Sequence, residues 1–425
     1  MKKRLIVYGF SSKAESGIIE ELKGRGDVEV AFWLASRHSP DSVGNLNRCR
    51  LDLDSYAPYD ISAYDEVKRN FFEYFCCHNR QKQVFLRREK FYDYIDFFNR
   101  YFQRFHKLLK DVNPDAVVFN NIPHLGPDIM LYYTAKALGV KTVMFYQSLF
   151  PNRVFCLNSI DDFSRMGELP VLGGGTYEIK RTFKKDLFYM KKRAGGLFNG
   201  ITKPSRLYFA FINLAKMGYA IQHKRRLKAA TCASPDLEGN FVYFPLHLQP
   251  ELTTNPLGGE YADQMLAIEH LSNMLPDDWL ICVKENPYQD EYRRGRAFFE
   301  RLAAVKKARL VPGDTSTYEL MEKCRFVATV TGTAGWEAIT GGKNALVFGQ
   351  AWYKTLPGVF EFSKSLKLDD ILNYRLDHAE LQEAVNGLYG RLGCAIMNTD
   401  YGKNYPGYDE AQNRKAASDL IARLV

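Results

Sequence analysis

Short apolar runs alternate with amphipathic stretches along most of the chain, which is typical of a doubly wound α/β sheet. Residues 4–10 (RLIVYGF) predict a strand ending in glycine, IIEELKGRG predicts a helix, and VEVAFWLA predicts the next strand. After a break at Asn113-Pro114, DAVVFNN, DIMLYYTAKALG and KTVMFYQ predict another β-α-β unit. Parallel sheets are built from such units, so we expect one in the first half of the chain.

Two other regions have different patterns. The aromatic-rich stretch 65–110 contains no proline or glycine and predicts one or two long helices. The strand–helix alternation restarts at FVYFPL and continues through WLICVK, RRGRAFFERLAAV, ARLV, FVATV and NALVFG, with helices expected over 261–274 and from Tyr318. This second set of units predicts a second Rossmann-like domain.

Four parts follow from these patterns. We expect an N-terminal Rossmann-like domain with a long helical insertion over 1–163, a basic helical connector over 164–240, and a C-terminal Rossmann-like domain over 241–405. A last helix over 406–425 is placed to cross back to the first domain. The fold class is therefore α/β, with two Rossmann-like domains facing across a cleft.

Composition supports a packed globular protein. The chain has 425 residues, of which 46% are hydrophobic and 25% charged, so two or three domains are expected and disorder or collagen is excluded. No apolar run is long enough to span a membrane, and Met1-Lys2-Lys3-Arg4 leads into a strand-like segment without a cleavage site. Eight scattered cysteines form no CxxC pair and are interpreted as reduced thiols of a cytoplasmic protein.

The positive charge is concentrated in one segment. The net charge is +9, and residues 180–228 carry 14 Lys or Arg against one acid, Asp186. The rest of the chain is therefore slightly acidic, which argues against a general polyanion-binding surface.

Polar residues follow three predicted strands of the second half. In open α/β sheets the ligand crevice lies at the carboxyl ends of the strands, so these residues should face one cleft. They are His247, Gln249 and Glu251 after FVYFPL, then Lys284, Asn286 and Pro287 after WLICV, and finally Thr331, Gly332, Thr333, Ala334, Gly335 and Glu337 after FVATV.

The segment that begins at Thr331 predicts a phosphate site. Glycine and threonine between a strand and a helix leave N–H groups and hydroxyls free at the helix N-terminus, where a phosphate binds. Glu337 is expected in the first helical turn, with a ribose hydroxyl as its partner, while Lys284 supplies charge and Asn286 a donor. The structural alternatives are a tight turn with a capping threonine, a solvated lysine, and a His247 that belongs to the core.

The first half supplies two weaker candidates. The turn containing Gly9, Ser11 and Ser12 is a candidate acceptor-binding site, although it lacks the full dinucleotide fingerprint. The pair Asp161 and Asp162 follows the last predicted strand of that half and is a candidate nucleophile or base. Acid pairs in loops also commonly just face water.

Three motifs give a family resemblance. YFPLHLQPE and VKENP resemble the "QP" and "HP" motifs of the retaining Kdo transferases that build bacterial capsule linkers and O-antigens, and VTGTAGWEAITGGKNALVFG resembles their phosphate loop. The resemblance covers roughly residues 242–353. It implies the two-domain GT-B fold, a CMP-linked 3-deoxy-ulosonic acid donor, and nucleotide binding mainly in the C-terminal domain. Bacterial sialyltransferases carry a comparable motif trio.

The sequence departs from that pattern at two positions. Asn286 replaces the histidine of the second motif, and Tyr146-Gln147-Ser148 stands where the Kdo enzymes have Glu-Asp-Gly. The resemblance implies a carboxylate nucleophile near here, and Asp161-Asp162 come later in the chain than that motif. Two alternatives therefore stay open: a CDP-alditol phosphotransferase of the teichoic-acid type, and a nucleotide-binding scaffold with a decayed active site.

The basic stretch 180–228 interleaves Lys and Arg with apolar residues at spacings that suit amphipathic helices. Such helices lie on anionic membranes, and a capsule enzyme needs this because its acceptor is held on a lipid. The alternative is two helices packed on the core with solvated basic faces. Nucleic acid is not an expected partner, because no recognition motif accompanies the basic residues.

The expected protein is thus a cytoplasmic glycosyltransferase, peripheral at the inner face of the cytoplasmic membrane. Its expected donor is a CMP-sugar, most simply CMP-Kdo or a related ulosonic acid, and its acceptor is a lipid-linked or oligosaccharide chain. A CMP leaving group needs no divalent ion to shield a diphosphate, and no DxD stands in a metal-binding context. We therefore expect neither a cofactor nor a metal ion.

Overall fold

The computed structural model describes residues 2–35, 60–80, 90–183, 218, 221–233, 237–289, 294–398, 402, 405 and 407–425. The contacts divide the chain into two compact units. Unit 1 comprises Met1–Gln83, Arg87–Tyr177 and Val385–Val425, and unit 2 comprises Val84–Leu86 and Glu178–Ala384.

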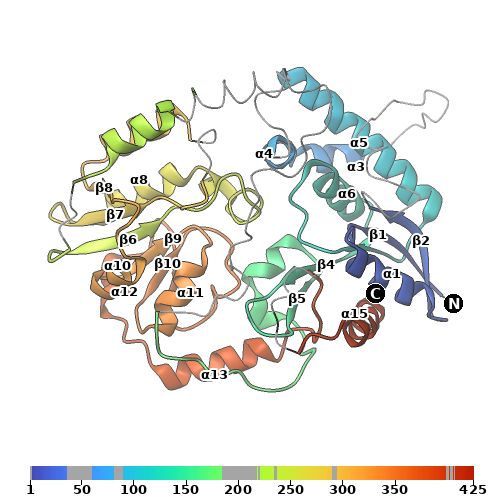
Figure 1. Cartoon of the computed structure of the whole chain (residues 1–425). Helices are drawn as coiled ribbons and strands as arrows, with labels where there is room; N and C mark the ends of the chain where they lie inside the picture. Colours follow the sequence, from blue (N-terminus) through green and yellow to red (C-terminus); the bar gives the residue numbers. More distant parts are fainter. Residues whose placement is uncertain are drawn as a thin grey trace. The chain divides into compact units, whose positions relative to one another are not determined.

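Unit 1 contains a five-stranded sheet in the order β2-β1-β3-β4-β5 (Figure 1). Its first four strands are parallel, and β5 runs antiparallel to β4. The strands are β1 (Lys3–Tyr8), β2 (Val28–Leu34), β3 (Ala116–Phe119), β4 (Lys141–Gln147) and β5 (Val154–Leu157). Apart from solvent-accessible β2, these strands are largely buried, as expected for a sheet covered on both faces.

Helices α1 and α15 lie side by side in unit 1 (Figure 1). The Ser12 hydroxyl accepts the Glu15 N–H at 3.2 Å and begins α1 through a capping box. Arg25, just after α1, forms an ion pair with Asp419 on α15. The helices of this unit are α1 (Lys13–Lys23), α3 (Ile61–Lys68), α4 (Phe71–Arg80), α5 (Phe91–Val112), α6 (Gly126–Ala137) and α15 (Glu410–Leu424), with 3-10 turns η2 (Ile160–Ser164) and η3 (Met166–Glu168).

Unit 2 contains a six-stranded parallel sheet in the order β11-β10-β9-β6-β7-β8 (Figure 1). Its strands are β6 (Phe241–Pro245), β7 (Leu280–Lys284), β8 (Ala308–Leu310), β9 (Val327–Thr329), β10 (Ala345–Val347) and β11 (Val359–Glu361). Its helices are α8 (Gln264–Met274), α9 (Arg296–Ala304), α10 (Thr317–Lys323), α11 (Thr333–Thr340) and α12 (Leu368–Asn373), and α13 (His378–Tyr389) runs on into unit 1.

The fold class expected from sequence is confirmed as two α/β units, the first with a mostly parallel sheet and the second with a parallel sheet. The sequence did not predict β5 or β11, and the described part of 65–110 contains three helices rather than one or two. Residues 164–177 and 385–405 group with unit 1, whereas the sequence boundaries placed them in the connector and the second domain. One reason is a backbone bridge between Val154 of β5 and Gly393.

Residues 184–217 of the expected basic connector lie outside the described residues. A helical segment over 221–230 buries His223 against Phe299 of unit 2, while Lys224 and Lys228 are exposed. Among the described residues, no helix combines the length and the apolar character needed to cross a membrane.

Candidate active site at the strand ends of unit 2

His247, two residues after β6, connects its own loop to the loop after β9. Its backbone N–H donates to the Gln264 Oε1 atom at 2.7 Å. Its ring Nε2 lies 2.9 Å from the Thr329 Oγ1 atom, and the Thr331 N–H donates to the same nitrogen at 3.3 Å. The Gly332 N–H in turn donates to the Thr329 Oγ1 atom at 3.2 Å. The polar segments that follow β6 and β9, both predicted from the sequence, are therefore joined through the His247 ring.

These contacts determine the tautomer of His247. Because Nε2 accepts the Thr331 N–H, the ring proton of the neutral form resides on Nδ1. Burial, and secondarily the charge of Arg294, lowers the pKa of His247 to about 4. The imidazole is therefore neutral at pH 7, and its Nδ1–H makes no hydrogen bond within the described residues.

The N-terminus of α11 lies directly beside this histidine. Gly332 is the N-cap and offers no side-chain cap, and the N–H groups of Thr333 and Ala334 have no partner among the described residues. A Cβ at Gly332 would lie 2.8 Å from the His247 Cε1 atom, and one at Gly335 would overlap the Tyr353 hydroxyl. Glycine thus permits a close approach of backbone to the imidazole, and the open N–H groups and helix dipole suit an anion.

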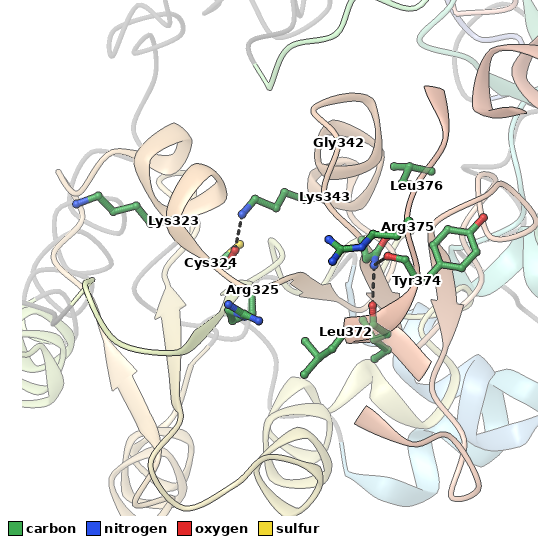
Figure 2. A pocket seen from close by; sticks show the side chains of 11 residues that line it. Lys323, Cys324, Arg325, Gly342, Lys343, Leu372, Tyr374, Arg375 and Leu376 are labelled. Carbon is green, nitrogen blue, oxygen red and sulfur yellow. Dashed lines mark hydrogen bonds between the residues drawn. The ribbon is translucent and has the colours of Figure 1, made fainter. Parts of the chain in front are cut away.

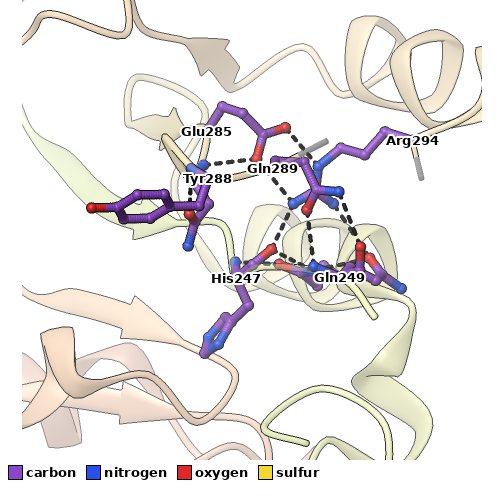
Figure 3. A network of polar contacts seen from close by, with 8 residues as sticks. His247, Gln249, Glu285, Tyr288, Gln289 and Arg294 are labelled. Carbon is purple, nitrogen blue, oxygen red and sulfur yellow. Dashed lines mark hydrogen bonds and ion pairs between the residues drawn. The ribbon is translucent and has the colours of Figure 1, made fainter. Parts of the chain in front are cut away.

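A buried arginine, Arg294, holds the His247 loop in place by hydrogen bonds (Figure 3). The Arg294 guanidinium donates to both Glu285 oxygens, with Nε–Oε2 at 2.6 Å and Nη2–Oε1 at 3.0 Å. The same Nη2 donates to the His247 carbonyl at 2.8 Å, and Nη1 donates to the Gln249 Oε1 atom at 3.3 Å. Arg294 is only 3% exposed, so this network is a fixed support rather than a ligand contact.

The side chain and backbone of Gln249 hold its own loop in place. Its Nε2 donates to the Ala262 carbonyl at 2.6 Å, and its Oε1 accepts from the Gln264 Nε2 atom at 3.0 Å. Its backbone N–H and carbonyl both bond to the Gln289 amide, and its bond to Pro250 is cis. The "QP" segment therefore acts by positioning the chain around His247.

The VKENP segment divides between two environments. Glu285 joins the arginine network, whereas the Lys284 ammonium donates to the Thr315 carbonyl at 2.5 Å and the Thr317 hydroxyl at 3.0 Å. Burial lowers the pKa of Lys284. The Asn286 Oδ1 atom accepts a backbone N–H at 2.9 Å, and Pro287 is exposed. Lys284 is thus directed toward the loop before α10.

The remaining predicted residues of unit 2 lie close by. Glu337 is buried in the second turn of α11 rather than the first, because the helix begins at Thr333, whose hydroxyl donates to the Glu337 Oε1 atom at 3.2 Å. The Thr331 hydroxyl donates to the Thr253 carbonyl at 2.6 Å. Glu251 is half-buried, and its backbone N–H donates to a threonine hydroxyl in the same loop.

The predicted residues of unit 1 have local structural contacts. Ser12 caps α1, Ser11 is half-buried, and a Cβ at Gly9 would overlap the Asn120 amide. The Asp162 carboxylate accepts the N–H groups of residues 158 and 159 at 2.8 and 3.0 Å and so caps η2, while Asp161 is exposed.

Several residues of this site, Gln264 among them, were not predicted from the sequence. Thr329, Arg294 and Tyr353 each contact the His247–α11 region, and the Tyr353 hydroxyl donates to the Gly332 carbonyl. Tyr353 follows β10 at the same sheet edge, which is a signal that strand-end reasoning could have used. Within the described residues, no group of three or more His, Cys, Asp or Glu side chains is placed to hold a metal ion.

Comparison with known proteins gives one family match. Residues 201–367 match the model of a family described as capsule polysaccharide biosynthesis protein, and the resemblance inferred from the motifs is thereby confirmed over those residues. Comparison with curated proteins gave no match.

Solved structures give distant similarities. The chain is similar to Thermosulfurimonas dismutans KpsC, beta Kdo 2,7 transferase, at 12% identity and a TM-score of 0.36, covering 79% of this chain and 98% of that one. The beta Kdo 2,4 transferase of the same KpsC matches at 11% identity and a TM-score of 0.34, over 73% and 87%. UDP-GlcNAc 2-epimerase from Methanocaldococcus jannaschii matches at 12% identity and a TM-score of 0.25, over 99% of each chain.

Proposed function

We propose that this protein is a glycosyltransferase of surface polysaccharide assembly. It transfers a sugar, Kdo or a related ulosonic acid, from a CMP-activated donor to a lipid-linked or glycan acceptor. Support comes from the family match over 201–367, which includes the loops after β6, β7 and β9. The main structural support is that the neutral His247 ring lies beside the N-terminus of α11, whose first N–H groups are unbonded among the described residues.

In this proposal the donor phosphate occupies the α11 N-terminus. The N–H groups of Thr333 and Ala334 and the helix dipole attract the phosphate, and the His247 Nδ1–H is a further donor. With a pKa of about 4, His247 is a hydrogen-bond donor to the departing CMP rather than a proton source at neutral pH. Its contribution is thus electrostatic, because a fixed donor favours the charge that develops on the leaving group.

Asp161 and Asp162 are proposed to act at the anomeric carbon of the donor or to accept the proton of the acceptor hydroxyl. Asp161 is the stronger candidate of the two, because it is exposed while the Asp162 carboxylate is used as the cap of η2. The reaction is proposed to need no metal ion. The basic segment 180–228 is proposed to hold the enzyme at an anionic membrane surface on the cytoplasmic side.

The test is a thermal-shift comparison of CMP, CDP, UDP and GDP on the full chain. A ligand at 100 times its Kd stabilises the fold by about 2.7 kcal/mol, so CMP alone should raise the Tm clearly. His247→Ala should lose most of that shift, while the exposed control Lys306→Ala should keep it. Transfer from CMP-Kdo should then persist in the presence of EDTA.

Other thermal-shift patterns would support one of the alternative functions instead. A shift with CDP alone supports an alditol-phosphate transferase, and a shift with UDP or GDP removes the CMP-sugar assignment. A CMP shift without donor hydrolysis or transfer supports a nucleotide-binding scaffold.

A further inference from the structure

A polar cavity lies in unit 2 at the opposite edge of the sheet from His247. It has a volume of about 430 Å³ and opens beside Arg325, which precedes β9, and beside Lys343 and Asn344, which precede β10. Of the described residues that line it, four are cationic, namely Lys323, Arg325, Lys343 and Arg375, and none is acidic. It is therefore separate from the strand-end site.

Two of the four cations have structural partners. Lys323 forms ion pairs with Glu238 at 2.9 Å and with Glu319 at 3.5 Å. The Lys343 ammonium donates to the Cys324 carbonyl at 2.8 Å, which satisfies an acceptor just after α10. These contacts explain why Lys323 and Lys343 are present without any ligand.

Arg325 and Arg375, unlike the two lysines, have among the described residues no partner that would account for their presence. Within the described residues neither guanidinium forms an ion pair or a hydrogen bond, and both residues are exposed. The carbonyls of Ile371 and Tyr374 near the end of α12 are already bonded to the Asn344 Nδ2 atom, at 2.6 and 3.0 Å. The arginines are therefore not needed to cap that helix.

Figure 2 shows how the cationic side chains are arranged. Arg325, Lys343 and Arg375 extend from three different segments toward a common space, while the Tyr374 ring points away from it. Several cations around one hollow, with no acidic residue among the described residues that line it, create a local positive potential that attracts an anion.

A further cation, Arg181, lies near one of the lining residues, Gly342. The Arg181 Nη2 atom lies 3.9 Å from the position of a Cβ on Gly342, and the Phe183 ring lies against Gly341, where a Cβ would overlap it. The start of the basic segment 180–228 thus lies beside Gly341 and Gly342, and Gly342 lines the cavity.

We propose that this cavity binds a phosphate group, held by Arg325 and Arg375 with Lys343 adding positive charge. A guanidinium matches phosphate bidentately, and Lys343 keeps donor capacity beyond its bond to the Cys324 carbonyl. The phosphate can belong to a free phosphorylated molecule or to a phospholipid headgroup. The inference goes beyond the proposed transfer reaction and does not rest on it.

Calorimetric titration of the full chain tests this site with two probes, inorganic phosphate and dihexanoyl-phosphatidylglycerol below its micelle concentration. The test variant is Arg325→Ala/Arg375→Ala. The matched control, Lys306→Ala/Lys364→Ala, removes the same charge from exposed positions of unit 2. Phosphate that binds elsewhere on the protein binds equally to both variants, so the difference between the native protein and the test variant measures the cavity.

In the native protein at least one probe should show a binding component that the test variant weakens at least about tenfold, while the control changes that component less than about twofold. If the test variant loses affinity for phosphate alone, the ligand is a free phosphorylated molecule. If it loses affinity for the lipid alone, the ligand is a phospholipid headgroup. Equal affinity of native protein and test variant, an equal loss in the control, or no binding of either probe to the native protein would overturn the proposal.

Discussion

His247 Nε2 lies 2.9 Å from the Thr329 Oγ1 atom, and this contact joins the loop after β6 to the last residue of β9. The two residues are 82 positions apart in the chain. Because Nε2 accepts hydrogen bonds, the pair fixes the imidazole with its Nδ1–H available to a ligand. The geometry of the strand-end site therefore depends on keeping His247 neutral.

The first prediction concerns pH and stability. Burial lowers the pKa of folded His247 to about 4, below the ordinary value of about 6.5 in the unfolded chain. Between these values the unfolded state binds a proton that the folded state does not. The free energy of unfolding should therefore fall as the pH falls through that window, by about 3 kcal/mol at pH 4, and be unaffected by His247 above pH 7.

Urea unfolding at pH 7 and pH 4.5 measures this effect in the native protein and in His247→Gln. The glutamine retains an acceptor for the Thr331 N–H but does not titrate, so its stability should depend less on pH. His270→Gln removes a different imidazole of the same unit and should keep the native pH dependence. An unchanged slope in His247→Gln would show that His247 does not titrate as described.

The second prediction concerns the buried ion pair. Arg294→Ala leaves the Glu285 carboxylate without its bidentate partner and the His247 carbonyl without a donor. Breaking a buried pair from one side typically costs about 3–5 kcal/mol, so we expect a loss of that size in urea unfolding. Arg296→Ala is the control, because its side chain is 77% exposed and a solvent-screened surface pair such as that with Glu300 contributes little to stability.

The double variant Glu285→Gln/Arg294→Met separates charge from packing. It removes both charges together, so it should recover part of the stability that Arg294→Ala loses. A loss below about 1 kcal/mol in Arg294→Ala would contradict the role of Arg294 as the support of the His247 loop.

The third prediction distinguishes a positioning lysine from a phosphate-binding one. The Lys284 ammonium bonds to the Thr315 carbonyl and the Thr317 hydroxyl, so Lys284→Met should lower the free energy of unfolding by about 1–3 kcal/mol. The Kd for CMP should change less than about threefold, whereas His247→Ala should raise it more than about tenfold. Direct binding measurements on both variants decide this, and a large rise in Kd for Lys284→Met would place its charge at the phosphate.

Much of the fold was predictable because its strands are short apolar runs ending in polar residues. FVYFPL, WLICVK and FVATV became β6, β7 and β9, as expected. In contrast, β11 has only three residues, none of them buried, so its apolar pattern gives little signal. β5 is an antiparallel edge strand, which the β-α-β pattern does not predict.

The candidate site was predictable only in part. Strand ends correctly brought His247 together with the Thr331–Gly332 turn, because carboxyl ends of parallel strands share one edge. Thr329 was missed because inside FVATV it is indistinguishable from any β-branched strand residue. Arg294 was missed because its contact with Glu285, nine positions earlier in the chain, follows no helix or strand spacing that the sequence reveals.

The last prediction uses two N-cap glycines with similar backbone angles. Gly332 has φ −72° and ψ 155°, and Gly295, the N-cap of α9, has φ −75° and ψ 177°, so alanine is sterically allowed by the backbone at both. A Cβ at Gly332 would lie 2.8 Å from the His247 Cε1 atom, whereas a Cβ at Gly295 meets none of the described residues within 4 Å.

Gly332→Ala should therefore displace His247 from α11 and raise the Kd for CMP at least about tenfold, with a lower Tm. Gly295→Ala should leave both quantities close to native, because it adds the same methyl group where space is open. Thermal unfolding with and without CMP measures the two effects in one experiment. Equal behaviour of the two variants would show that the close approach of His247 to the α11 N-terminus has no part in binding the donor.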